Sequence, residues 1–372
     1  MEIGTFELER YFAKHEFSAQ YLLSSSDCEA LSLADLLELT DKDTIRLWQE
    51  LKLGYTESMG HPQLRETIAE IYKGIEAENI LVAAPEECIF LLMHALLEPG
   101  DHVISTFPGY QSLYEVARSI GCQVSTWEPH ESQGWHFEID DLAGMLQTNT
   151  KLVVANFPHN PTGYVPSRED FLALVAIMRE HGAYLFSDEM YRFLEVDLGV
   201  TLPAACELYE RAFSLFGMSK TFGLPGLRIG WLASQERETL DHVSMLKDYT
   251  TICSSAPSEV LAIVALRARE KIIAQQTERV ARNIGVLETF FDEYADLFRW
   301  NRPKGGSICF PRMVAVDNTY DFCAQLVESE SILLAPSRAF QFGDQHVRIG
   351  FGRENLPQVI ERFASYLDRR FR

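Results

Sequence analysis

The sequence lacks several patterns that would assign its 372 residues to a specialised class of protein. It contains no CxxC pair, and its seven cysteines are odd in number and widely scattered, which argues against both a disulfide framework and a zinc knuckle. No apolar run is long enough to cross a membrane, and the N-terminus shows no charged-then-apolar signal pattern. These absences predict a cytoplasmic protein without a membrane segment.

Basic residues are scarce beside acidic ones, with 33 Lys and Arg against 54 Asp and Glu, a formal net charge of −21. Nucleic-acid affinity depends largely on basic side chains that neutralise phosphates, so the charge argues against a nucleic-acid partner. No P-loop, HExxH or GxGxxG motif occurs, which also weakens the case for a nicotinamide oxidoreductase. The two histidines of residues 128–136 indicate an exposed loop rather than a metal site, and we expect no metal.

Short β-rich runs alternate with helical stretches along the chain. Strands are predicted at 102–108, 151–158, 183–189, 211–217 and 228–234, and helices at 61–75, 85–101, 167–182, 258–298 and 355–371. The alternation predicts an α/β fold whose large domain, residues 45–265, has a mostly parallel sheet flanked by helices. Residues 1–44 and 266–372 are predicted to form a smaller α+β domain.

Polar side chains follow four of the predicted strands. They are Tyr110, Asn160, Asp188 and Lys220. Each has a simpler explanation when taken alone, because Asp188 can cap a helix, Asn160 before a proline can build a turn, and an isolated lysine is usually solvated. Ligands of open parallel sheets bind at the carboxyl ends of the strands. Four such residues therefore predict one common site.

Three motifs in this region, NPTG (160–163), SDEMY (187–191) and MSKTFGLPGLRIGW (218–231), occur in the order typical of one family. Together they resemble the class I/II aminotransferases, which are pyridoxal-phosphate enzymes of fold type I. The resemblance extends from about residue 53 to residue 356. It implies transamination of an α-amino acid to its 2-oxo acid, with pyridoxal 5'-phosphate held as a Schiff base by Lys220.

The resemblance also implies roles around the cofactor ring. Lys220 supplies the amine and shuttles protons, and the carboxylate of Asp188 keeps the pyridine nitrogen protonated. Tyr191 and Asn160 match the pair that hydrogen-bonds the phenolic oxygen of the cofactor. The ring of Tyr110 matches the aromatic side chain that stacks on the pyridine, although core packing is the alternative reading.

Further roles concern the phosphate and the substrate. Arg228 matches a phosphate-binding arginine, with Ser219 as an additional donor, and Arg348 matches the arginine that pairs with the substrate α-carboxylate. Arg353 is expected to be structural. Tyr55 matches a tyrosine that reaches the phosphate in the neighbouring subunit, which implies a homodimer.

Two departures from the family pattern concern the phosphate. Gly217 stands where the family often has Ser or Thr, and the turn AAPEEC (83–88) has Pro85, which lacks an N–H, followed by the carboxylates of Glu86 and Glu87. Backbone N–H groups at this helix start can still bind phosphate, so Glu86 is kept as a cofactor-binding candidate. The carboxylate of Glu86 would then have to point away from the phosphate.

The reaction type stays open at this point, because the same residues serve C–S lyases, decarboxylases and cyclising or oxidising relatives. The stretches 188–195 and 247–259 resemble the capreomycidine synthase-like branch, which acts on arginine-derived amino acids. Glu195 and Asp248 are then candidates for meeting a cationic substrate, although surface ion pairs explain them equally well. Segment 22–33 is expected to close over the site. A non-catalytic, ligand-binding regulator is the remaining alternative.

Overall fold

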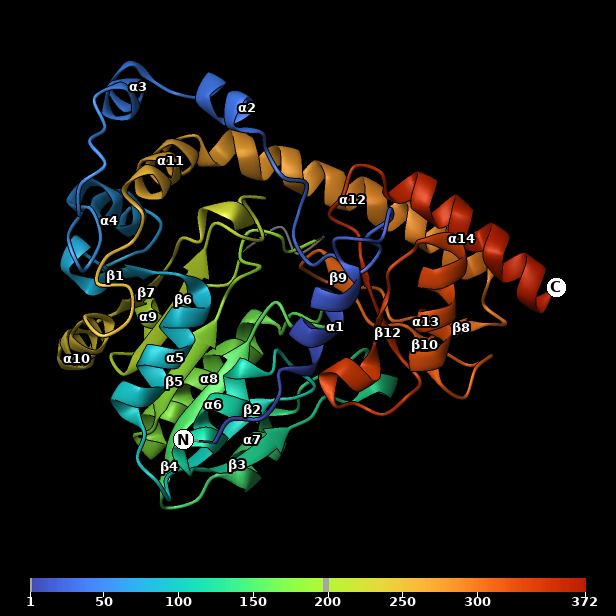
Figure 1. The fold of residues 1–372 in the computed structure, drawn as a ribbon. Coiled ribbons are helices and arrows are strands. Elements are labelled where there is room, and N and C mark those ends of the chain that lie inside the picture. Colours follow the sequence, from blue (N-terminus) through green and yellow to red (C-terminus); the bar gives the residue numbers. More distant parts are fainter. Residues whose placement is uncertain (1, 197–200) are drawn as a thin grey trace.

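The computed structural model describes residues 2–196 and 201–372. Its largest sheet has seven strands in the order β1-β7-β6-β5-β4-β2-β3 (Figure 1). These strands are β1 (Ile80–Ala83), β2 (His102–Thr106), β3 (Gln123–Trp127), β4 (Thr150–Asn156), β5 (Tyr184–Asp188), β6 (Ala212–Gly217) and β7 (Gly230–Ser234).

The predicted α/β class and mostly parallel sheet are confirmed. Strands β3, β2, β4, β5 and β6 run parallel to one another. Within this sheet only β7 runs in the opposite direction, and β1 pairs antiparallel with β7 and so has the same direction as the other five strands. The parallel strands share one carboxyl-end edge, where the candidate residues were predicted to meet. The short strands β1 and β3 were not predicted from the sequence.

Helices cover both faces of this sheet, and others belong to the C-terminal part. Along the described chain the helices are α1 (Glu7–His15), α2 (Leu33–Glu38), α3 (Lys42–Gln49), α4 (Pro62–Ala69), α5 (Pro85–Leu96), α6 (Ser112–Ile120), α7 (Ile139–Met145), α8 (Arg168–His181), α9 (Ala205–Leu208), α10 (Arg237–Lys247), α11 (Ala256–Arg267), α12 (Arg269–Glu293), α13 (Thr319–Glu330) and α14 (Leu356–Phe371). Short 3-10 turns are η1 (Ala77–Asn79), η2 (Glu131–Gln133), η3 (Pro225–Leu227) and η4 (Ser337–Phe340).

The side chains of β4 show how the two faces are filled. Leu152 and Val154 pack with α5, α6 and α10, whereas Val153 and Ala155 pack with α7 and α8 on the other face. Both sets are buried because the strand lies inside a three-layer arrangement, which explains why residues 152–155 are all apolar rather than alternating. Of the described helices, none is long and apolar enough to cross a membrane.

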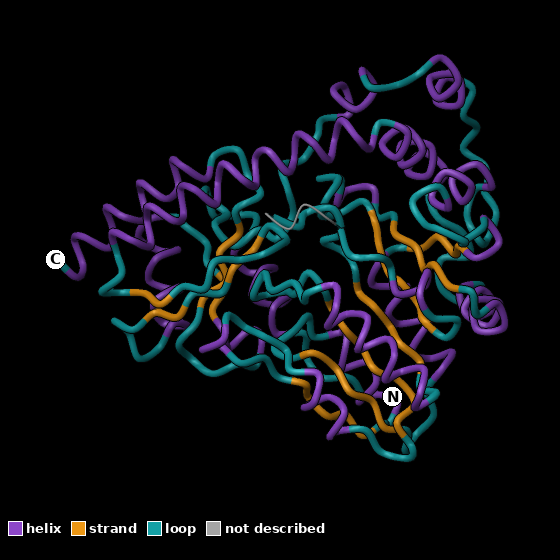
Figure 2. Tube along the Cα trace, turned by 180° about the vertical axis from the view of Figure 1, so that it is seen from behind, coloured by secondary structure: helices purple, strands orange, loops and turns teal. Residues whose placement is uncertain are grey.

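The C-terminal part has its own core, in which α12, α13 and α14 pack on two small sheets. These sheets are formed by β8 (Phe298–Arg299) with β10 (Arg312–Met313), and by β9 (Ile308–Cys309) and β11 (Ala335–Pro336) on either side of β12 (Val347–Gly350). Helix α12 connects the two cores, since Ile272 near its start packs with α4 and α11 while Val280 and Leu287 pack with α14 (Figure 2). The helical stretch predicted over 258–298 is divided at Ala268 and ends at Glu293.

The N-terminal segment contacts both the C-terminal part and the loop before α6 of the large sheet's helical cover. The hydroxyl of Tyr11 in α1 donates to the carbonyl of Leu334 at 2.8 Å, and the amide of Gln111 donates to the carbonyl of Thr5 at 2.7 Å. Helix α2 instead contributes Leu36 to the core around α4 and α11. The predicted domain limits, 44/45 and 265/266, stay a prediction.

Candidate active site

A cavity of about 690 Å³ lies at the carboxyl ends of the parallel strands. Nine of the ten candidate residues line it. They are Glu86, Tyr110, Asn160, Asp188, Tyr191, Ser219, Lys220, Arg228 and Arg348. The tenth, Tyr55, is 90% exposed and lies outside this lining. The fold therefore brings together side chains that are up to 262 positions apart in the chain, from Glu86 to Arg348.

Lys220 reaches the cavity from the loop that follows β6. Its Nζ donates a hydrogen bond to Oγ of Ser26 at 2.8 Å. Burial lowers the pKa of Lys220, while the carboxylate of Asp27 acts in the opposite direction. A lowered pKa increases the fraction of neutral amine, which is the nucleophilic form.

Asp188 ends β5 and is buried at the floor of the cavity, where its carboxylate accepts the N–H of Met190 at 3.1 Å. Burial raises the pKa of Asp188 to about 7, and this N–H and the nearby Lys220 only partly offset the effect. A carboxyl group in this position is stabilised in its charged form by any cation that enters the cavity beside it.

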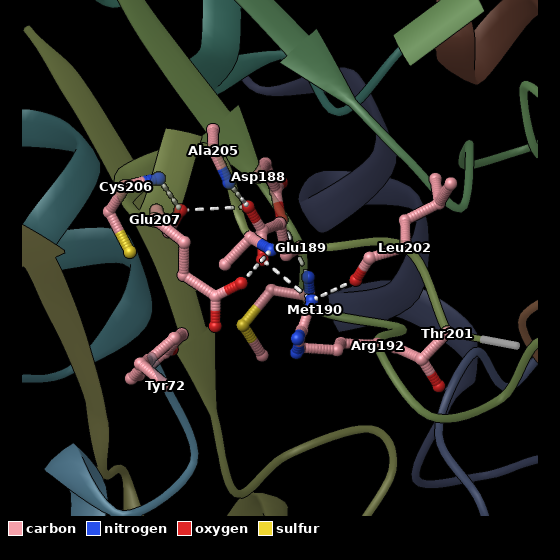
Figure 3. Close-up of polar contacts among 12 residues, drawn as sticks. Tyr72, Asp188, Glu189, Met190, Arg192, Thr201, Leu202, Ala205, Cys206 and Glu207 are labelled. Atoms are coloured by element: carbon pink, nitrogen blue, oxygen red, sulfur yellow. Dashed lines mark hydrogen bonds and ion pairs between the residues drawn. The ribbon is translucent and has the colours of Figure 1, made fainter. Parts of the chain in front are cut away.

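A buried polar cluster holds the segment that carries Asp188 (Figure 3). Glu189 accepts the N–H of Ala205 at 2.9 Å and forms an ion pair with Arg192 at 3.4 Å, and Arg192 donates to the carbonyl of Leu202 at 2.7 Å. Residues 189 and 192 thus point into the protein interior, whereas Asp188 and Tyr191 line the cavity. Because the ion pair is buried and bonded on both sides, it fixes the direction of the two cavity residues.

Arg348 of β12 is buried beside Asn160. Its Nη1 donates to Oδ1 of Asn160 at 3.1 Å and its Nη2 to the carbonyl of Ser24 at 2.9 Å. No ion pair to Arg348 and no partner for its Nε are present among the described residues. Burial lowers the pKa of Arg348. Since a buried unpaired guanidinium is costly, an anion such as a substrate carboxylate would be bound favourably here.

Asn156 was missed at the sequence level, although it ends β4 in the run VVANF. Its amide donates to the carbonyl of Asp188 at 3.0 Å, and its Oδ1 accepts the backbone N–H of Asn160 at 2.8 Å. It therefore joins the loops that follow β4 and β5. The signal that could have identified it is its place at a strand end.

Tyr110 and Glu86 lie on the side of the cavity covered by α1. The hydroxyl of Tyr110 donates to Oε1 of Glu9 at 3.0 Å, and the ring packs on Phe6 with centroids 4.9 Å apart. Burial raises the pKa of Glu86 to about 7, although its carboxylate accepts the hydroxyl of Ser112 at 3.2 Å. The carboxylate of Glu87 accepts the hydroxyl of Thr251 and so turns toward α10 instead.

Arg228 and Ser219 line the same cavity as Pro85 and Glu86 of the first turn of α5. Arg228 has a left-handed backbone conformation, φ +54°, which is strained for any residue but glycine and is typical of functional loops. The first turn of a helix offers backbone N–H groups without intrahelical acceptors. A guanidinium, a hydroxyl and these N–H groups form a donor set suited to a phosphate.

The structure explains the departure at Gly217. Gly217 pairs with Gly230 across β6 and β7, and a Cβ at position 217 would lie 2.9 Å from Cα of Gly230 and 2.9 Å from the carbonyl oxygen of Ile229. The ring of Pro85 packs over both glycines, 2.8 Å from where a Cβ of residue 230 would lie. The two departures in the sequence are thus one packing arrangement, which leaves no room for Ser or Thr at 217.

Replacing Gly217 by serine is therefore expected to lower the free energy of unfolding by about 2–3 kcal/mol, because the added atoms overpack the contact between the two strands. Urea denaturation followed by circular dichroism measures the change. Gly226→Ser is the matched control, since an added Cβ there meets nothing within 4 Å. Equal stabilities of the two variants would contradict the explanation.

Neither Glu195 nor Asp248, the candidates for meeting a cationic substrate, lines the cavity. Glu195 accepts a hydrogen bond from Thr201 at 3.3 Å and Asp248 accepts one from Ser58 at 3.2 Å. The acidic side chains that do line it from the N-terminal region are Glu9, Glu16 and Asp27. Among the described residues, no group of three or more His, Cys, Asp or Glu side chains could hold a metal ion.

The unsatisfied groups of the cavity fit pyridoxal phosphate. The buried hydroxyl of Tyr191 has no well-formed hydrogen bond to a described residue. Among the described residues, the only hydrogen-bond donor to the buried carboxylate of Asp188 is a backbone N–H, and the amine of Lys220 is close by. A donor for a phenolic oxygen, an anion for a pyridinium nitrogen and an amine for an aldehyde are the groups that this cofactor requires.

Comparisons with known proteins agree with this fit. Residues 20–363 match the family model described as aminotransferase class I and II. A capreomycidine synthase from Streptomyces vinaceus is 28% identical over 347 residues, 92% of this chain and 88% of that protein. An aspartate aminotransferase from Thermotoga maritima is 29% identical over 337 residues, with 88% and 85% covered. The crystal structure of a PLP-dependent aminotransferase from Streptococcus suis superimposes with a TM-score of 0.93 at 32% identity, covering 99% of both chains.

Proposed function

Because this chain belongs to the class I and II aminotransferases, which depend on pyridoxal phosphate, we propose that it transfers the amino group of an α-amino acid to a 2-oxo acid in the cavity around Lys220. The observation that carries the proposal is the grouping of Lys220, Asp188 and the unpaired Arg348 around one cavity. An amine, a buried carboxylate and a buried guanidinium are together what this reaction needs.

Bound pyridoxal phosphate would supply an electron sink for the bond that breaks at Cα of the substrate. Lys220 is the residue that would hold its aldehyde carbon, Asp188 its pyridine nitrogen, and Arg228 with Ser219 its phosphate. Tyr191 would donate to its phenolic oxygen.

The remaining steps are performed by the chain's own residues. Arg348, oriented by Asn160, would bind the α-carboxylate and thereby place Cα of the substrate within the cavity. The amine of Lys220, in which burial lowers the pKa and so favours the neutral form, would take the proton from Cα and return it. Helix α1, whose Glu9 bonds Tyr110, would limit access of water.

The charges left over in the cavity favour an amino acid with a cationic side chain. Asp27 is paired with Arg353 through two contacts of 2.9 and 3.0 Å, but Glu16 makes no side-chain hydrogen bond or ion pair to a described residue. Glu9 and Glu16 lie seven positions apart at α1 and its end, so they share one face. Burial, with Glu9 and Asp27 nearby, raises the pKa of Glu16, and a cationic side chain would relieve this repulsion. Arg10 of the same helix also lines the cavity, but its side chain is exposed.

Glu16→Gln is therefore expected to raise KM for arginine roughly five- to tenfold, since a partly exposed ion pair contributes about 1 kcal/mol. KM for a neutral amino acid such as alanine should stay within about twofold. Steady-state kinetics with both substrates measure the split. Glu361→Gln, on the exposed side of α14, is the matched control, and an equal change for both amino acids would count against a cationic substrate.

A second candidate reaction at the same site is another pyridoxal-phosphate conversion of an arginine derivative, which the similarity to a capreomycidine synthase favours. The products separate the two possibilities. Transamination needs a 2-oxo acceptor and yields a 2-oxo acid, whereas a cyclisation, elimination or decarboxylation needs none.

The direct test is a screen of amino acids against the purified chain with pyridoxal phosphate, including arginine and hydroxylated arginine. Aminotransfer converts the visible spectrum to that of the pyridoxamine form without an acceptor, and mass spectrometry then detects the 2-oxo acid when 2-oxoglutarate is added. A chain that binds the cofactor but turns over no amino acid would be a regulator. That result would overturn the proposal.

We also propose that the enzyme is a homodimer in which Tyr55 reaches the partner's site. Leu53, Tyr55 and Tyr249 are large apolar side chains with exposed fractions of 84%, 90% and 91%, which is unusual for a surface that faces water. Sedimentation equilibrium is expected to give twice the 42.4 kDa of one chain. The two-part division into 45–265 and 1–44 with 266–372 belongs to the same proposal, with Arg348 supplied by the smaller part.

A further inference from the structure

Segment 22–29 runs between β12 and the loop that carries Lys220. The carbonyl of Leu23 accepts the N–H of Gly350 at 2.8 Å, and the N–H of Cys28 donates to the carbonyl of Lys220 at 3.3 Å. The packing at Gly350 is so close that a Cβ there would lie 1.7 Å from the carbonyl oxygen of Ser25. The segment is thus held from both sides of the cavity and has little freedom to move.

Within this segment, Ser26 contacts the amine of Lys220. The distance from its Oγ to Nζ is 2.8 Å. Its backbone carbonyl accepts the hydroxyl of Ser307 at 2.9 Å, one of several contacts that hold this segment. The same hydroxyl of Ser26 also lies near Tyr191, where it opposes the rise that burial causes in the pKa of that phenol. Ser26 therefore stands next to two of the residues assigned to the cofactor.

We propose that Ser26 is a positioning residue that holds the ε-amine of Lys220 in place whenever this amine is free. The proposal rests on the proposed function, in which the substrate displaces Lys220 and the released amine moves a proton at Cα. A lysine side chain has four rotatable bonds, so a released amine without a partner would spend much of its time in unproductive orientations.

A hydroxyl suits this task better than a carboxylate. It accepts a hydrogen bond from the ammonium form and donates one to the neutral form, so the contact persists while the proton is carried. A carboxylate in the same place would favour the ammonium form and weaken the base. The charged groups that face Lys220 are Asp27, Arg348, Glu9 and Asp188, and the nearest polar contact is nevertheless the neutral Ser26.

The test measures how the reactivity of the Lys220 amine depends on pH, in the absence of substrate and catalytic turnover. The full chain, freed of cofactor by dialysis against phenylhydrazine, is acetylated with acetic anhydride at several pH values, and peptide mass spectrometry gives the rate at Lys220. Ser26→Ala is expected to shift this profile to lower pH, because the hydrogen bond lost by the ammonium form is charge-assisted and stronger than the one lost by the neutral amine. In the cofactor-loaded enzyme kcat should fall about tenfold while KM stays within about twofold.

Three further variants separate positioning from structure. Ser26→Thr keeps the hydroxyl and should restore both readouts, and Ser26→Cys, with a thiol that bonds weakly, should be intermediate. Ser307→Ala releases the backbone of Ser26 but leaves its hydroxyl, so the acetylation profile should not move. The proposal is overturned if Ser26→Ala leaves both readouts unchanged, or if Ser307→Ala reproduces them. Because acetylation needs no substrate, a protein that fails as an aminotransferase can still pass or fail this test.

Discussion

Replacing Lys220 by alanine is expected to lower turnover by roughly a thousandfold or more, because in the proposed reaction this one amine is the covalent attachment point, the general base and the general acid. The loss should be in kcat. Arg348 and Arg228 remain in the cavity, so the variant should still bind substrate and cofactor non-covalently. No described amine other than that of Lys220 lines the cavity.

The measurement combines kinetics with borohydride reduction and peptide mapping. In the unmodified chain, reduction should attach the cofactor to the peptide that contains Lys220, and in the variant no peptide should carry it. Lys73→Ala, an exposed lysine at the end of the region after α4, is the matched control and should behave like the unmodified chain. If Lys220→Ala still formed a reducible adduct and still turned over, the assignment of the lysine would be wrong.

Asp188→Asn is expected to lower kcat roughly 10²–10³-fold, because an amide cannot stabilise a protonated pyridine nitrogen through its charge. The change is nearly isosteric, and the N–H of Met190 can still donate to the amide oxygen. Asp292→Asn on the exposed side of α12 provides the control. Activity within tenfold of the unmodified enzyme would argue against this role for Asp188.

The same substitution should stabilise the cofactor-free chain above neutral pH. In the folded chain the pKa of Asp188 is raised to about 7, so the folded state binds more protons than the unfolded one between about pH 4 and pH 7. Stability is then present at low pH and is lost as the pH rises through this window, by an amount on the order of 4 kcal/mol. The amide that replaces the carboxyl group does not titrate, so the variant escapes this loss. Thermal unfolding at pH 8 should show the variant several degrees more stable than the cofactor-free parent, with no such gain at pH 4. A variant less stable than the parent at pH 8 would show that the ionised carboxylate of Asp188 does not destabilise the folded chain.

The local sequence was sufficient to predict the position of a residue where one short segment contains both the strand and the polar residue that follows it. Lys220, Asp188 and Asn160 each follow an apolar strand, and parallel strands must end at one edge, so their meeting could be predicted without coordinates. Strands β1 and β3 were missed because runs of four or five residues without a strong period are ambiguous. The break at Ala268 was missed because neither glycine nor proline marks it.

Contacts between distant segments could not be predicted in this way. Gly217 is confined by Ile229 and Gly230 of the neighbouring strand, and Pro85, which lies 132 positions before Gly217, packs over this contact. The partner of the lysine amine is Ser26, 194 positions away. Whether Glu195 and Asp248 face a bound substrate could not be decided from the sequence for a similar reason, and neither of them lines the cavity. Acidic residues are common in this chain, and only the fold decides which of them reach the cavity.

The sequence by itself determined the fold class, because the alternation of strands and helices is a local pattern, and it indicated pyridoxal phosphate and Lys220 through motifs that resemble those of the class I and II aminotransferases. The tertiary structure alone decided how Gly217 is packed, which carboxylates line the cavity, and which group contacts the lysine amine. These properties depend on distances between segments that the chain brings together only when its cores form. For Lys220, the motif indicated the residue, and the tertiary structure brought Ser26 of segment 22–29 into contact with its amine.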